Sequence, residues 1–237
     1  MAVQLSIIIP CYNEASTIAK CIEGIKNSAS NHTELDIIVV DGNSTDGTIH
    51  ILKTLPVTTI FSTTRGRAKQ LNIGAQVASG EILYFLHADT LPPPHFDLLI
   101  LEANNSKIDA GCFRLKFDHK HWFLKANAWF TRFNCDSFRF GDQSLFINKM
   151  AFVDIGGFNE ASLVFEDQEI IKRIRQYYIF KVLRQCVISS ARMYLKNGIY
   201  FTQLYYFYLF VLYQCGASQA LILSKYRRNL NRCDIED

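Results

Sequence analysis

Short apolar runs alternate with amphipathic segments over the first ninety residues, and this alternation constrains the fold more than any other feature. The runs are rich in Ile, Val and Leu and end at turn-forming or polar residues, which is typical of buried strands. The segments between them carry apolar residues at helical spacing. We therefore predict strands over 5–10, 36–42, 57–63 and 81–89, and helices over 13–28, 69–79 and a segment that starts at Thr48. Such an alternation predicts a parallel sheet with helices on both faces.

The pattern changes after about residue 110. Strands are predicted over 111–117 and 144–149, with an aromatic stretch, 121–133, between them. Residues 163–176 predict a helix with an acidic first turn, which suits the helix dipole. For the first helix, either Asn13 or Ser16 is a candidate N-cap. A chain of 237 residues can form one large domain or two smaller ones.

Charge and cysteine content narrow the class of protein. The formal net charge is +3, which does not indicate a nucleic-acid binder, because such a protein needs a concentrated basic face. The seven cysteines are scattered and form no CxxC pair, which favours reduced thiols in a cytoplasmic setting. The chain opens with MAVQLSIIIP, in which we expect a first strand and no signal peptide.

Polar residues follow three of the predicted strands, at Tyr12–Glu14, Asp41–Ser44 and His87–Asp89. In open parallel sheets, ligands bind beyond the carboxyl ends of the strands. One polar strand end is explained by contact with solvent. Three at the same edge of one sheet predict a binding site.

Five motifs then resemble a known family. PCYNE, VVDGNSTDGT, LHADT, GGFNE and FEDQEIIKRIR are similar, in order and approximate spacing, to the inverting glycosyltransferases of family 2, which have the GT-A nucleotide-sugar fold. RGRAKQLNIGA, FLHADTLPP and FGDQSLFI resemble the subgroup named for its association with radical-SAM and selenodomain proteins. The resemblance implies a GT-A α/β domain over 1–195, with a mostly parallel sheet flanked by helices, and leaves 196–237 as a helical extension. It also implies sugar transfer from a nucleotide-sugar donor, expected to be UDP-linked, to an acceptor hydroxyl with inversion.

The resemblance implies a divalent cation bound by Asp89 through the donor diphosphate. Mg²⁺ and Mn²⁺ suit oxygen ligands and keep waters and substrate phosphates in their shell. His87 stands where the family's DxD pattern often has its first aspartate, and a neutral imidazole can bind manganese or donate to a phosphate. We therefore assign Asp89 as metal ligand, with His87 as a second candidate and Ala88 between them in the donor site. The alternative for these three residues is a polar strand cap.

Donor contacts are assigned by the same resemblance. Asp41 corresponds to the base-contacting aspartate, whose carboxylate accepts from a ring N–H, whereas Ser44 and Asp46 are expected to shape the turn. Positive groups near the start of a predicted helix suit a diphosphate, although a solvated basic turn is the alternative. The remaining expected donor contacts are Pro10, Tyr12, Glu14, Arg65 and Arg67.

The expected general base is Asp167, because inversion by direct displacement needs one carboxylate to deprotonate the acceptor hydroxyl. Glu166 is expected to orient it, and Asp142 and Gln143 to lie on the acceptor or sugar side. The alternative for the acidic pair is complementation of the helix dipole. Arg192 is a candidate diphosphate contact, but the QxxRW motif of processive family members is absent, which favours a single transfer.

An aromatic tail, 198–216, follows, and from Ile199 to Tyr213 only Thr202 and Gln203 are frankly polar. At ~1.5 Å per residue this stretch reaches ~22 Å, short of the ~30 Å of a hydrocarbon core, so a spanning helix is not expected. Residues 199–215 are expected to pack on the domain, to form a homodimer, or to make peripheral contact with the inner face of the membrane. The basic run 225–232 suits anionic headgroups, and membrane contact suits a lipid-linked acceptor.

Two other functions remain open at this point. A nucleotidyltransferase also uses a parallel sheet, acidic strand ends and magnesium, but it usually has a glycine-rich loop where this chain has CYNEAS. A non-catalytic nucleotide-sugar-binding scaffold is kept open by His87 and opposed by Asp89 and Asp167.

Overall fold

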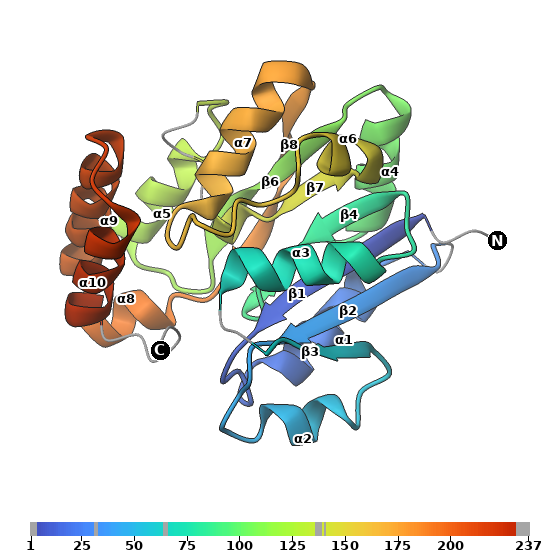
Figure 1. The fold of residues 1–237 in the computed structure, drawn as a ribbon, viewed down its shortest axis with the longest axis horizontal. Coiled ribbons are helices and arrows are strands. Elements are labelled where there is room, and N and C mark those ends of the chain that lie inside the picture. The colour runs from blue at the N-terminus through green and yellow to red at the C-terminus, as the bar shows by residue number, and fades with distance from the viewer. Residues whose placement is uncertain (1–3, 31–32, 64–65, 136–138, 140, 231–237) are drawn as a thin grey trace.

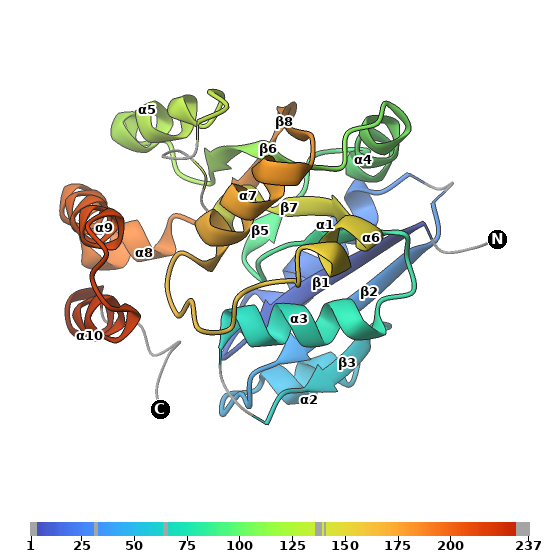
Figure 2. The same cartoon turned by 45° about the horizontal axis from the view of Figure 1, so that its top comes forward.

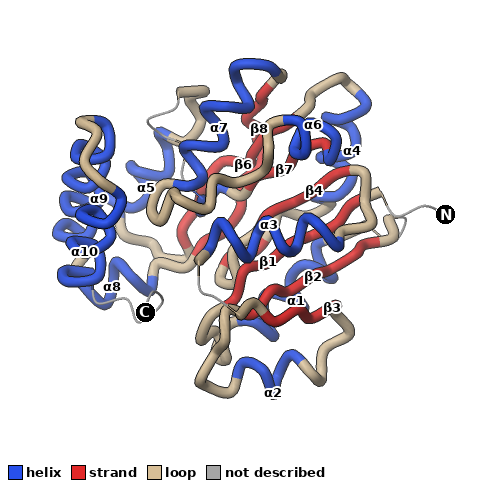
Figure 3. The backbone as a smooth tube through the Cα atoms, viewed as in Figure 1, coloured by secondary structure: helices blue, strands red, loops and turns tan. Residues whose placement is uncertain are grey.

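A computed structural model describes residues 4–30, 33–63, 66–135, 139 and 141–230 of the chain. Within these residues one eight-stranded sheet runs through the molecule in the order β3-β2-β1-β4-β7-β6-β8-β5 (Figures 1 and 3). The strands are β1 (Leu5–Cys11), β2 (Leu35–Asp41), β3 (Thr58–Phe61), β4 (Ile82–Phe85), β5 (Thr90–Leu91), β6 (Ala110–Phe117), β7 (Leu145–Asn148) and β8 (Phe180–Ser189).

The first four strands are parallel, as the alternation predicts. β1 lies between β2 and β4, and β2 also pairs with β3. Parallel strands bury both faces, so successive side chains of β1 enter different cores. Leu5, Ile7 and Ile9 pack in one core, whereas Ile8 packs in the other. This arrangement brings the carboxyl ends of β1, β2 and β4 to one edge of the sheet.

The second half of the sheet is mixed. β7 is antiparallel to both β4 and β6, β8 is parallel to β6, and the short β5 is antiparallel to β8. β7 thus lies between β4 and β6 in the sheet, although it follows both of them in the sequence. The loop that leads into it, 141–144, consequently lies at the same sheet edge as the loop after β4.

Helices cover both faces of the sheet, as Figure 1 shows. Apolar residues of α1, α4 and α5 pack in the first core, and those of α3, α6 and α7 in the second. Their bounds are α1 (Ile18–Ser28), α2 (Thr48–Leu52), α3 (Arg67–Val77), α4 (Phe96–Asn105), α5 (Trp122–Phe130), α6 (Lys149–Asp154) and α7 (Glu166–Tyr177).

The two largest differences from the predicted boundaries are at the start of the first helix and at the end of the fourth strand. The first helix starts at Ile18 and not at Asn13, because Asn13 has a left-handed φ of 52° and its side chain accepts from the backbone N–H of Thr45. Thr17 is the N-cap residue, without a side-chain capping bond, so neither Asn13 nor Ser16 has that role. The strand predicted over 81–89 ends at Phe85, and His87, Ala88 and Asp89 lie in the loop beyond it.

The aromatic tail and the residues on either side of it form three helices near α5 (Figure 2). They are α8 (Arg192–Asn197), α9 (Ile199–Gln214) and α10 (Gln219–Leu230). Leu209 of α9 is fully buried in a third cluster with Ile222 and Tyr226 of α10, and Val164 and Phe165 pack against this cluster. Within the described residues, no helix combines the length and the hydropathy that crossing a membrane requires.

Candidate active site

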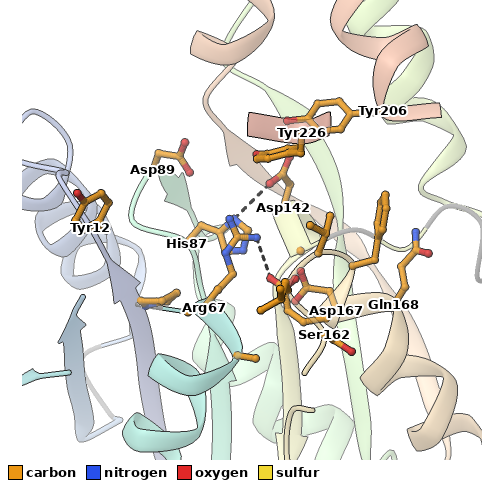
Figure 4. Close-up of a pocket in the computed structure, with 18 of the residues that line it drawn as sticks. Tyr12, Arg67, His87, Asp89, Asp142, Ser162, Asp167, Gln168, Tyr206 and Tyr226 are labelled. Carbon is orange, nitrogen blue, oxygen red and sulfur yellow. Dashed lines mark hydrogen bonds and ion pairs between the residues drawn. The ribbon is translucent and has the colours of Figure 1, made fainter. Parts of the chain in front are cut away.

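A cavity of about 900 Å³ opens at the carboxyl ends of β1 and β4 and extends to α9 and α10. Figure 4 shows Tyr12 and Asp89 toward one end and the C-terminal Tyr206 and Tyr226 toward another. Most of the predicted site residues line it, although they come from segments far apart in the chain. These lining residues are Pro10, Tyr12, Glu14, Arg67, His87, Ala88, Asp89, Asp142, Glu166, Asp167 and Arg192.

The acidic pair opens α7, so its carboxylates lie at the positive end of the helix dipole. Glu166 is buried and accepts from Nη1 of Arg67 at 3.1 Å. Next to this pair, Nδ1 of His87 lies 3.3 Å from Oδ1 of Asp142 (Figure 4). The two pairs connect α3 with α7, and the loop after β4 with the 3-10 turn Gly141–Gln143.

Among the carboxyl groups of the site, that of Asp167 has the most strongly shifted pKa. Desolvation and the neighbouring charge of Glu166 raise the pKa of Asp167 to about 7, against the opposing effect of His87 and Arg67. A carboxylate with a pKa near neutrality is a stronger base than an ordinary aspartate and is still partly ionised at physiological pH. The environment of Asp167 is therefore suited to accept a proton from an acceptor hydroxyl.

Gly141 is the residue that lets the loop approach Asp167 closely. A Cβ at this position would lie 2.1 Å from Oδ2 of Asp167 and 2.9 Å from Cε1 of His87. Both distances are below those that real Cβ atoms show, so any side chain here would displace one of the two residues. The glycine in FGDQ is thus a site residue that the sequence reasoning missed, and its position directly before Asp142 was the available signal.

We expect Gly141→Ala to lower sugar transfer by about 10²-fold, because a displacement of roughly 1 Å at a reacting group has an effect of that size. Transfer rates with purified protein and a matched melting curve measure this. Gly47→Ala is the control, since a Cβ there meets nothing nearer than Ala15 at 3.8 Å. Equal transfer rates for Gly141→Ala and the wild type would contradict the tight packing of Gly141 on Asp167.

Arg192 joins the two predicted donor residues Glu14 and Asp89. Its Nη1 donates to Oε2 of Glu14 at 2.8 Å, its Nη2 also pairs with Glu14, and the same Nη2 lies 3.4 Å from Oδ2 of Asp89. The side chain of Asp89 is only 14% exposed, and desolvation together with the charge of Asp142 raises its pKa. Arg192 therefore compensates a carboxylate that burial destabilises.

The possible metal ligands in this region suit a divalent cation that is also bound by the substrate. No group of three His, Cys, Asp or Glu side chains is arranged to hold a metal ion anywhere in the part of the chain that the structure describes. The carboxylate of Asp89, beside that of Asp142, offers oxygen atoms in a buried setting with excess negative charge. Mg²⁺ and Mn²⁺ bind through one or two carboxylates plus substrate phosphates, which matches this set.

Two predicted contacts do not line the cavity, and a third lies outside the described residues. Asp41 is fully buried and accepts from the backbone N–H and the hydroxyl of Ser44, at 2.9 and 2.5 Å, so its contact with a base stays a prediction. Gln143 is 1% exposed and accepts from Arg139, so its side chain supports the turn that carries Asp142. The expected acceptor or sugar contact of Gln143 stays a prediction. Arg65 is not among the described residues.

The expected turn roles of Ser44 and Asp46 are confirmed. The hydroxyl of Ser44 accepts from the backbone N–H of Asn13 at 2.9 Å, while Asp46 accepts from the backbone N–H of Thr48 and of Ala15. These bonds hold the loop after β2 against the loop after β1. The rim of the cavity near Tyr12 is therefore fixed by backbone contacts.

The second end of the cavity is rich in apolar residues and comes largely from the C-terminal helices, with Gln203 and Arg227 among its polar lining residues. The sequence motifs assigned no site residue there, although the aromatic composition of the tail was a visible signal. Phe165, which precedes the acidic pair with a left-handed φ of 63°, packs against the rings of Phe210 and Tyr213 on α9. The apolar lining residues include Phe130, Phe207, Phe210, Leu223 and Tyr226.

Comparison with known proteins decides the family. The family model described as glycosyl transferase family 2 matches residues 6–158, more than half of the chain. The chain belongs to this family. Among curated family 2 relatives, an uncharacterised glycosyltransferase of Nostoc is 31% identical over 98 residues, 39% of this chain and 30% of the relative. The glycosyltransferase AglE of Haloferax volcanii is 33% identical over 94 residues, 37% and 31% of the two chains. These alignments span about a third of each relative's own length.

Solved structures of two other proteins share the fold. Residues 1–349 of TarS from S. aureus match with a TM-score of 0.65 at 17% identity, over 80% of this chain and 61% of that one. A mannosyltransferase from Pyrobaculum calidifontis, solved with GDP-Man and Mn²⁺, matches with a TM-score of 0.65 at 21% identity, over 78% and 56%. The expected GT-A α/β fold is therefore confirmed, while the radical-SAM-associated subgroup stays a prediction.

Proposed function

We propose that this chain is a metal-dependent, inverting glycosyltransferase that moves a sugar from a nucleotide-sugar donor to an acceptor hydroxyl. The observation that carries the proposal is that one cavity contains two carboxyl groups in different environments. Asp167 has a pKa raised to about 7, and Asp89 forms an ion pair with Arg192. Structural neighbours include one solved with GDP-Man and Mn²⁺ and one solved with UDP-GlcNAc, which supports a nucleotide-sugar donor.

In this mechanism Asp167 deprotonates the acceptor hydroxyl as its oxygen attacks the anomeric carbon from the face opposite the leaving group. Glu166 supports the base in two ways. Its negative charge raises the pKa of Asp167, and its ion pair with Arg67 anchors the start of α7 to α3. His87, close to the same carboxylate, opposes the rise in pKa and is held by Asp142.

The donor would occupy the end of the cavity at β1 and β4, with its diphosphate near Asp89 and Arg192. Asp89 would hold a divalent cation, with His87 as second candidate, and the cation would stabilise the negative charge of the departing nucleoside diphosphate. Arg192 already balances the charge of Asp89 and is placed to contact the same diphosphate. We propose UDP as the nucleotide, with Tyr12 stacking on its base. A contact from the base to Asp41 would require Ser44 to release that carboxylate.

The acceptor end supports an amphiphilic, lipid-linked acceptor. Its wall contains Phe207 and Phe210 of α9, Leu223 of α10 and Phe130 of α5. A sugar or phosphate alone would leave these rings without an apolar partner, whereas a hydrocarbon chain next to the reacting hydroxyl would bury them. We assign residues 1–195 to the catalytic domain and 196–237 to an extension that completes this acceptor end at the inner face of the membrane.

Incubation with Mn²⁺ and a panel of sugar nucleotides tests the proposal. Slow release of a nucleoside diphosphate from one donor, together with thermal stabilisation by it, is the expected result. Pyrophosphate release from a nucleoside triphosphate would replace the proposal with nucleotidyl transfer. Donor binding without turnover, in the presence of any hydroxyl acceptor tested, would indicate a nucleotide-sugar-binding scaffold.

The pH dependence of transfer follows from Asp167. Since the base must be ionised and its pKa is raised to about 7, kcat should rise with pH through about 7 and level off above it. Glu166→Gln removes the neighbouring negative charge, so the midpoint should move to lower pH. Rates at saturating donor across this range measure both curves. A midpoint that does not move in Glu166→Gln would contradict the assignment of the titrating group to Asp167.

A further inference from the structure

Helix α9 exposes an apolar stripe to solvent. Leu204 is 68% exposed and Phe207 is 61% exposed, in a chain where most large apolar residues of the sheet and its flanking helices are buried. The exposed residues recur every three or four positions, so they share one side of the helix. They are Tyr200, Phe201, Leu204, Phe207, Tyr208 and Val211.

Helix α5 and the turn after it extend this stripe. The ring of Tyr200 lies 4.9 Å from that of Phe123 and 6.5 Å from that of Trp122, and Asn127 donates to Gln203 at 3.0 Å. These contacts hold the two helices together. We define the α5–α9 face as the exposed residues of α9 above together with Trp122, Trp129, Phe130 and Phe133.

The sequence segments that form this face are basic. Segments 119–135 and 190–230, which contain α5 and α8 to α10, carry eight Lys or Arg residues and no Asp or Glu. The rest of the chain has 17 Lys or Arg residues against 22 Asp or Glu residues. Basic groups also border the aromatic rings: the guanidinium of Arg132 lies 4.3 Å from the ring of Trp129, and the ammonium of Lys225 lies 5.6 Å from that of Tyr208.

We propose that the α5–α9 face docks this chain on the surface of an anionic lipid bilayer. Trp and Tyr are the residues that favour the interface between headgroups and hydrocarbon, and basic groups beside them attract anionic headgroups. A second copy of the chain fits less well, because it would bring two positive surfaces together.

Docking in this way would bring the cavity to the bilayer. Phe130 and Phe207 belong to the α5–α9 face and also line the cavity, so the apolar end of the site opens at the docking surface. An acceptor with its hydrocarbon part in the bilayer would reach Asp167 without leaving the interface. This consequence rests on the proposed transfer reaction, whereas the docking surface itself does not.

Vesicle flotation with the full chain tests the proposal without any substrate. Vesicles with about one-third phosphatidylglycerol in phosphatidylcholine should bind the protein at low salt, and pure phosphatidylcholine should bind it far less. The variant Trp122→Gln/Leu204→Gln removes two exposed apolar groups that do not line the cavity, and should weaken partitioning by about ten-fold or more. Its control, Met150→Gln/Val153→Gln, changes two exposed apolar residues of α6 and should bind as the wild type does.

A charge variant provides the second arm. Arg132→Gln/Lys225→Gln should weaken binding to the anionic vesicles by roughly five-fold for each charge, whereas Lys26→Gln/Lys53→Gln, on α1 and just after α2, should have little effect. Unchanged melting temperatures establish that all variants fold. Absence of binding to anionic vesicles overturns the proposal, as does an equal loss in the controls. A wild-type dimer that Trp122→Gln/Leu204→Gln dissociates would assign the face to a second copy instead.

Discussion

Asp167→Asn is expected to lower sugar transfer by about 10²- to 10⁴-fold, the usual contribution of a positioned general base. The substitution keeps the size and shape of the side chain, so the close packing against Gly141 is preserved. A carboxamide has no basic oxygen for the hydroxyl proton. Donor binding should therefore be retained, because the residues that flank the diphosphate lie on other loops.

Two measurements distinguish this result from a general loss of structure. Calorimetry with the donor and Mn²⁺ should give the wild-type affinity, and the residual rate should no longer rise with pH through about 7, since the titrating carboxyl is gone. Asp154→Asn, an exposed acid on α6 that accepts from Tyr178, is the matched control and should leave transfer unchanged. Full transfer activity in Asp167→Asn would remove the base from this residue.

Asp89→Asn is expected to abolish the effect of Mn²⁺ on donor binding and to lower transfer by about 10²-fold or more, since a bound cation supplies several kcal/mol of charge stabilisation. In the wild type, UDP with Mn²⁺ should raise the melting temperature more than UDP alone. In the variant the two shifts should be equal.

Arg192 is the reason that this experiment needs its own control. Asp89→Asn also removes the ion pair between Asp89 and Nη2 of Arg192, at 3.4 Å, so the guanidinium of Arg192 would be held less firmly. Glu14→Gln breaks the other side of the same arrangement and leaves the carboxylate of Asp89 in place. If Glu14→Gln abolishes the Mn²⁺ effect as completely as Asp89→Asn, the role of Asp89 is to position Arg192 and not to bind a cation.

The parallel half of the sheet could be predicted because its signals are local. Ile7 and Ile9 alternate with Ile8 between two cores, and one strand follows the next through a helix. The mixed half could not be ordered in advance, because β7 enters between β4 and β6 through pairings that no local pattern encodes. The start of the first helix was predicted wrongly because a side chain there accepts a hydrogen bond from a distant backbone N–H, as Asn13 does from Thr45.

The candidate site shows the same division. Residue types and motif order predicted which carboxylates gather in the cavity, since strand ends meet at one edge of a sheet. They did not predict that Glu14 pairs with Arg192, 178 positions away, or that Asp41 turns its carboxylate to Ser44. Such contacts depend on packing between segments that the chain brings together only after folding.

Phe165 connects the C-terminal helices of the chain with the acidic pair Glu166 and Asp167. A bulky residue with a left-handed backbone costs of order 1–3 kcal/mol, and here the rings of Phe210 and Tyr213 hold it directly before Glu166 and Asp167. Gln219 at the start of α10 also accepts from the backbone N–H of Val164, at 3.0 Å. A chain shortened at Gly198 would keep every carboxylate of the cavity. It would lose the contacts of α9 and α10 with Val164 and Phe165, which directly precede Glu166 and Asp167. The proposed contact with a membrane surface and the proposed alignment of Asp167 therefore depend on the same helix, α9.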